Sequence, residues 1–183
     1  MRTILIFLII LLYSSGLFAQ TNYYTENKVF DEVDYSYQCE LDSSGIVYLF
    51  NKENKLTYED MKFKNTGKIF IPEDENIKTF TYESWLVYRK VFSRIINSAF
   101  TESEINILKA NALSIYLEYF INTETGNIDE IKFMFLDTSA FVLIPVSVYR
   151  NIELQIKKIC HFIITEEGKK INYVYLSDAF KFE

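Results

Sequence analysis

Acidic side chains are the residues of this sequence with the clearest potential for chemistry, and many of them lie in its first half. Most glycoside hydrolases use a pair of carboxylates that flank the scissile bond. The run at 72–75, a proline followed by three acids, is more typical of a solvated loop than of a catalytic cluster. A small carboxylate-based hydrolase therefore stays open as an alternative, with candidate acids at Asp31, Glu32, Asp34, Glu59, Asp60, Glu73, Asp74 and Glu75.

Nucleophilic catalysis would have to use His161, since it is the single histidine. It follows Cys160 directly, but adjacent residues of a helix point about 100° apart and do not face each other. We expect His161 to interact with the last carbonyls of a helix. The sequence has no histidine pair at metal-ligand spacing, no calcium loop, no phosphate-binding loop and no dinucleotide fingerprint. We therefore predict no catalytic residue, no metal, no cofactor and no enzymatic activity.

Composition narrows the function classes further. The chain has 183 residues, of which 49% are hydrophobic and 17% aromatic, and its formal net charge is −6. This length suits one domain or two small ones, and the negative charge argues against a nucleic-acid partner. The aromatic excess fits either core filling or a face that stacks on a glycan or grips a peptide. The tyrosines on expected strands are Tyr35, Tyr37, Tyr48, Tyr58, Tyr173 and Tyr175.

The first 19 residues have the layout of a secretory signal peptide. Arg2 precedes a short apolar run, and small residues lead to Ala19 at the expected cleavage point. We predict export to the periplasm or out of the cell, with no membrane-spanning segment after cleavage. In an oxidising compartment Cys39 and Cys160 either pair as a disulfide or stay buried as free thiols.

The elements expected in residues 20–100 form an antiparallel meander and one helix. A polar leader at 21–32 precedes strands at 33–41, 46–50 and 56–63, which are separated by short polar turns. After a loop, apolar residues recur at helical spacing over 81–99.

Residues 101–183 predict a helix–strand–strand–helix–strand order. Thr101 and Glu104 form a capping box that opens a helix over 102–111. Strands at 113–121 and 128–136 flank a hairpin in which Gly126 takes the positive-φ position. A helix over 146–162 and a strand over 171–176 follow, and 177–183 reads as a tail.

This second half resembles the C-terminal domain family of TonB, a small α+β periplasmic module. The resemblance rests on the hairpin at 122–133, the apolar-striped helix at 146–159 with Phe162 after it, and the strand at 168–173. The family's proline after the helix and its Pro-rich linker are missing, so an energy transducer is not implied. The whole chain is also similar to small secreted families of unknown function from Gram-negative gut bacteria, which implies export and no known activity.

We therefore expect an α+β protein, with a signal peptide at 1–19, a meander and helix at 20–100 and an α-β-β-α-β module at 101–183. Its predicted function is binding of an envelope or extracellular protein, or of a glycan. An antiparallel sheet can accept an extended peptide at an edge strand by main-chain hydrogen bonds. The resemblance implies that this edge is the last strand, and the candidate binding residues are Ile171, Asn172, Tyr173, Val174 and Tyr175.

Overall fold

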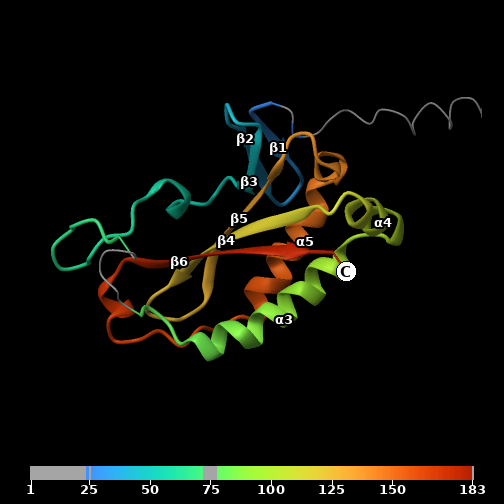
Figure 1. The fold of residues 1–183 in the computed structure, drawn as a ribbon. Coiled ribbons are helices and arrows are strands. Elements are labelled where there is room, and N and C mark those ends of the chain that lie inside the picture. Colours follow the sequence, from blue (N-terminus) through green and yellow to red (C-terminus); the bar gives the residue numbers. More distant parts are fainter. Residues whose placement is uncertain (1–23, 25, 72–77, 183) are drawn as a thin grey trace, which may run out of the picture.

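A six-stranded antiparallel sheet organises the computed structural model, which describes residues 24, 26–71 and 78–182 (Figure 1). The strand order is β1-β2-β3-β5-β4-β6, so β1 and β6 are the two edges. With three α-helices beside the sheet, the predicted α+β class is confirmed. The strands are β1 (Lys28–Asp31), β2 (Ser36–Leu41), β3 (Ile46–Asn51), β4 (Ser114–Asn122), β5 (Ile128–Leu136) and β6 (Tyr173–Lys181).

The two faces of the sheet differ because side chains alternate along each strand. On β4, Leu117 and Tyr119 are fully buried against the helices, whereas Tyr116 points to the opposite face and is 47% exposed. The same alternation on β5 buries Ile131 and Phe133. We call the side of the sheet that carries Tyr116 the open face.

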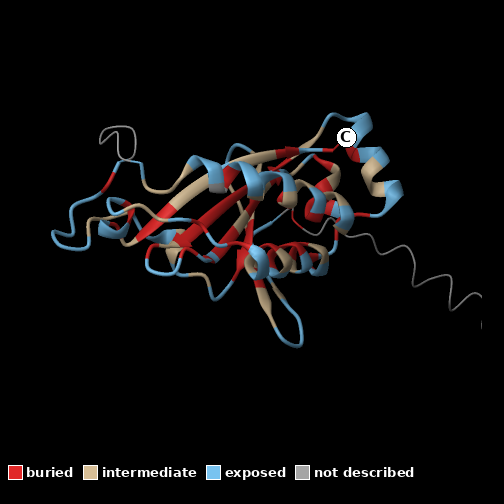
Figure 2. Cartoon of the chain, turned by 90° about the horizontal axis from the view of Figure 1, so that it is seen from below, coloured by how far each residue is buried: buried red, intermediate tan, exposed pale blue. Residues whose placement is uncertain are grey.

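The helices α3 (Tyr82–Ala99) and α5 (Val146–Ile159) lie side by side and cover the other side, and α4 (Glu102–Ala110) lies at one end of the sheet (Figure 1). Figure 2 shows that buried residues concentrate in the strands, while the outer surfaces of the helices are exposed. Helix α4 opens on the predicted capping box: the Glu104 amide donates to the Thr101 hydroxyl, and the Thr101 amide donates to the Glu104 carboxylate. The helices and strands of the second half follow the predicted order.

Four segments are assigned wrongly by the sequence-based prediction of secondary structure. The supposed leader at 21–32 contains β1, which forms because it pairs with β2. Residues 56–63 are not a strand: η2 (Leu56–Tyr58) is a single 3₁₀ turn, held because Glu130 on β5 accepts the amides of residues 55–57. Helix α5 ends at Ile159, before the predicted 162.

The fourth error concerns the supposed tail at 177–183. Strand β6 continues to Lys181, because β4 offers nine consecutive partners from Asn122 to Ser114. This extension lengthens the edge of the sheet that β6 forms.

Strands from both predicted halves share the sheet, because β3 pairs directly with β5. The predicted signal peptide lies outside the described residues. Among the helices of the described part, none has the length and apolar character needed to cross a bilayer.

Candidate functional site

The outer edge of β6 is the place where the candidate binding residues were expected, and its first part is already engaged. Ile171 forms a bridge with Phe63 just before β6 begins. The Asn172 amide donates to the Lys62 carbonyl at 3.0 Å, and the Asn172 side chain accepts the Lys62 amide at 2.8 Å. An incoming peptide would have to displace these contacts.

The other three predicted residues are held by side-chain contacts. Tyr173 and Val174 are 4% and 1% exposed, and the Tyr173 hydroxyl donates to the Glu59 carbonyl. The Tyr175 hydroxyl donates to the Glu118 carboxylate at 2.5 Å. Burial and the neighbouring carboxylate together raise the pKa of Tyr175. These side chains therefore build the sheet, and a ligand would meet β6 further along the strand.

The second half of β6 borders a groove of about 550 Å³ beside α3. Four consecutive residues of β6, 178–181, line it. Because side chains of a strand alternate between two faces, a run of consecutive lining residues means that the backbone edge itself faces the groove. The opposite wall is formed by Leu86, Arg89, Lys90 and Ser93 of α3.

Positive charge dominates this groove. Arg89 donates to the Asp178 carboxylate at 2.7 Å, and this contact raises the pKa of the guanidinium. The second oxygen of Asp178 accepts the Ala179 amide at 2.8 Å, so the one acid of the groove is fully engaged. Among the described residues, Lys90 and Lys181 form no ion pair.

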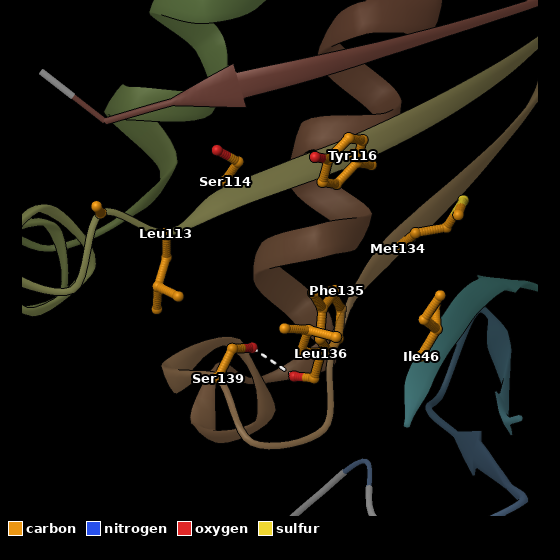
Figure 3. A pocket seen from close by; sticks show the side chains of 9 residues that line it. Ile46, Leu113, Ser114, Tyr116, Met134, Phe135, Leu136 and Ser139 are labelled. Atoms are coloured by element: carbon orange, nitrogen blue, oxygen red, sulfur yellow. Dashed lines mark hydrogen bonds between the residues drawn. The ribbon is translucent and has the colours of Figure 1, made fainter. Parts of the chain in front are cut away.

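A second hollow, of about 510 Å³, lies at one end of the open face (Figure 3). Its lining is mostly apolar and comes from β3, β4, β5 and the segments that flank them: Ile46, Ala112, Leu113, Ser114, Tyr116, Met134, Phe135, Leu136 and Ser139. The Ser139 hydroxyl donates to the Leu136 carbonyl at 2.5 Å and fixes the rim. The half-exposed ring of Tyr116 is the aromatic surface that a ligand would meet.

Two charged clusters were not predicted from the sequence. Glu118 and Lys132 face each other across β4 and β5, with 2.5 Å between carboxylate and ammonium and at most 15% of either side chain exposed. On α5, the fully buried Glu153 accepts from Arg150 at 3.0 Å, from Lys157 at 3.1 Å and from the Tyr37 hydroxyl. Burial, and then the Glu153 carboxylate, raise the pKa of Tyr37.

These clusters have a structural explanation. The Glu118–Lys132 pair joins neighbouring strands, and the Glu153 network fastens β2 to α5. The signal for Glu153 was present in the sequence, because a glutamate stands in the apolar stripe of its helix, four residues after the buried Tyr149.

The candidate catalytic acids do not converge on either hollow. Asp31 accepts the Ser36 hydroxyl at the β1–β2 turn, whereas Glu59 follows η2. None of the described candidates lines the groove or the open-face hollow, and 73–75 fall outside the described residues. The part of the chain that the structure describes contains no group of three or more histidine, cysteine or acidic residues that could hold a metal.

His161 and the cysteines do not form a reactive pair. The His161 ring is 3.2 Å from the Asn127 side-chain oxygen, and not on the helix carbonyls as predicted, because α5 ends two residues earlier. Cys39 and Cys160 are both free and buried. Burial raises the pKa of Cys39 to about 11 and that of Cys160 to about 12, so neither thiol is activated.

Comparison with known proteins gives a family. The family model described as "Domain of unknown function (DUF5043)" matches residues 20–178. The fold is similar to the crystal structure, at 1.85 Å resolution, of a DUF5043 family protein from Bacteroides uniformis ATCC 8492. That match has a TM-score of 0.77 and 31% sequence identity, and covers 88% of this chain and 94% of the other. No curated protein matches the chain, and neither match bears on the TonB resemblance. The chain belongs to the DUF5043 family.

Proposed function

We propose that this protein is an exported, non-enzymatic binding protein that holds an extended peptide segment of an envelope or extracellular partner along β6. The observation that carries the proposal is the run of four consecutive β6 residues, 178–181, whose backbone edge faces the groove beside α3. Unpaired backbone amides and carbonyls at a strand edge are a template for another strand. The partner's main chain supplies affinity, and its side chains meet α3 on one face of the sheet.

Two further observations support the proposal. The family domain begins at residue 20, immediately after the predicted signal peptide, as expected for an exported protein. The opposite edge, β1, is only four residues long, whereas β6 has nine residues. A longer edge offers more backbone groups to a bound strand, so β6 is the better docking edge.

The test is selection of binders from a random peptide library displayed on phage, with the exported protein as bait. Each selected peptide is then synthesised in three forms: one unmodified, and two that carry N-methyl groups on alternate amides, one in each of the two possible registers. We expect N-methylation in one of the two registers to weaken binding at least about tenfold, because it removes several main-chain hydrogen bonds of about 1 kcal/mol each. Equal affinity of all three forms contradicts strand addition.

A glycan ligand is the second candidate, and the exposed Tyr116 ring in the open-face hollow favours it. Aromatic rings provide a flat apolar surface on which a sugar can stack. A glycan array is the appropriate screen. Binding to any glycan that is lost in Tyr116→Ala, but retained in Tyr58→Ala on the 3₁₀ turn, supports this candidate, and the absence of array binding removes it.

A further inference from the structure

The charge of the groove between α3 and β6 identifies the chemistry of the segment that it takes. We infer that the bound segment is acidic, with carboxylates that reach Lys90 on α3 and Lys181 at the end of β6. This inference rests on the proposed strand addition at β6 and goes beyond it, since main-chain pairing alone selects no side chain.

The first argument is the contrast between the groove and the rest of the chain. The protein carries 25 acidic residues against 19 lysines and arginines, yet the groove contains three cations and a single acid. That acid, Asp178, already has Arg89 on one oxygen and the Ala179 amide on the other. Lys90 and Lys181 are thus left without a carboxylate partner within the described residues, and an incoming carboxylate supplies one.

The second argument comes from the next turn of α3. Arg94 lies beside Lys90 in an adjoining hollow of about 410 Å³, so the positive surface continues along the helix. Arg94 also forms no ion pair within the described part of the chain. A row of cations along one wall favours a partner with several acidic residues over one with a single acid, because complementary potentials steer association and fix register.

The third argument concerns the apolar surface between these cations. Leu86 and Val87 on α3 are 45% and 63% exposed; both line the adjoining hollow, and Leu86 also lines the groove. Every second side chain of an added strand faces α3, so a segment with both acidic and apolar residues among these alternate positions covers the cations and this surface together. A nucleic acid satisfies the charges but provides no strand edge for β6.

The experiment compares two peptides of about seven residues, the length of an ordinary strand. One alternates glutamate with valine and threonine, and its twin has lysine in place of each glutamate. Binding to the exported protein is measured by fluorescence anisotropy at low and high salt, and the site is mapped by changes in the backbone amide signals of 177–181. An oligothymidine of matched charge is the third probe.

We expect the glutamate peptide to bind at least about tenfold more tightly than its lysine twin at low salt, which corresponds to about 1.4 kcal/mol. The ratio should shrink at high salt, since exposed charges are screened. The double variant Lys90→Glu/Lys181→Glu should reverse the preference, whereas Lys109→Glu, an exposed lysine on α4, should leave it unchanged.

The outcomes separate the two proposals. Equal binding of both peptides, with amide changes at 177–181, overturns the acidic preference and leaves strand addition standing. Absence of binding by both peptides, or amide changes confined to other parts of the protein, overturns both. Oligothymidine that binds as tightly as the glutamate peptide overturns the acidic segment in favour of a nucleic-acid ligand.

Discussion

Replacing Gly126 by alanine should destabilise the fold far more than the same change at Gly67, although both glycines have positive φ. Gly126 has φ +73° in the β4–β5 hairpin, and Gly67 has φ +67° in a surface turn. A β-carbon at Gly67 meets no atom of the described residues within 4 Å, whereas one at Gly126 would lie 2.1 Å from the Phe162 carbonyl oxygen. A comparison of the two alanine variants therefore separates the energetic cost of a positive φ from the cost of the steric overlap with Phe162.

The structure sets the size of each effect. An L-residue at positive φ destabilises the folded state by about 1–2 kcal/mol. Alanine also lowers the conformational entropy of the unfolded chain, which offsets about 0.4–1 kcal/mol of this cost. Gly67→Ala should therefore lower the free energy of unfolding by about 1 kcal/mol. Gly126→Ala adds an overlap that cannot relax easily. The Phe162 amide donates to the Gly126 carbonyl at 2.7 Å, and the buried Phe162 ring packs on Trp85. Overpacking of this kind costs about 1–3 kcal/mol more, which brings the loss at Gly126 to about 3 kcal/mol.

Urea unfolding provides the assay, and the fluorescence of the single tryptophan reports on the relevant region. Trp85 is 9% exposed and its ring centroid lies 6.5 Å from that of Phe162. The expected difference of about 2 kcal/mol between the two variants is a large share of the 5–15 kcal/mol typical of a native protein. Equal losses in both variants, at unchanged m-value, would refute the argument that the hairpin is locked against the segment after α5.

Three other predictions concern buried polar groups and a helix cap. Tyr37→Phe should lower the free energy of unfolding by about 1.5–3 kcal/mol in a urea titration, because Glu153 loses a hydrogen bond inside the core; a loss under 0.5 kcal/mol would contradict this. Thr101→Ala should cost about 1 kcal/mol by the same measurement, since it removes the cap of α4, and no loss would mean that the cap is not formed. Cys39 and Cys160 should resist a thiol reagent at pH 8 until the protein unfolds, and fast labelling of the native state would contradict their burial. Because folding raises both thiol pKa values above 9.0, their contribution to stability is full below pH 9 and is lost as the pH rises through about 11 and about 12.

The sequence predicts those elements whose own residues determine them. The capping box at Thr101, the hairpin glycine Gly126 and the alternation of β5 are local signals, and the structure confirms each. The elements predicted wrongly depend on distant partners. Residues 56–58 are held in a 3₁₀ turn by Glu130, and the end of β6 is ordered by the start of β4.

The candidate site was predicted only in outline, for the same reason. The last strand does lie at an edge of the sheet, as predicted. The part of this edge that stays open is determined by segments far away in the chain. The segment around Lys62 covers Asn172, and α3 forms the groove beside Phe180. Helical spacing identifies α3 as amphipathic, yet it cannot show that Lys90 ends up next to β6.

Amide hydrogen exchange of β6, with and without a library-selected peptide, tests the central claim most directly. If an extended segment adds to this edge, exchange at the outward-facing amides of 177–181 should slow at least about tenfold, because a main-chain acceptor replaces solvent or, at Ala179, the Asp178 carboxylate. The amides of β1, at the opposite edge, should exchange as before and serve as the internal control. Protection confined to the open-face hollow around Tyr116, with 177–181 unchanged, would contradict the account.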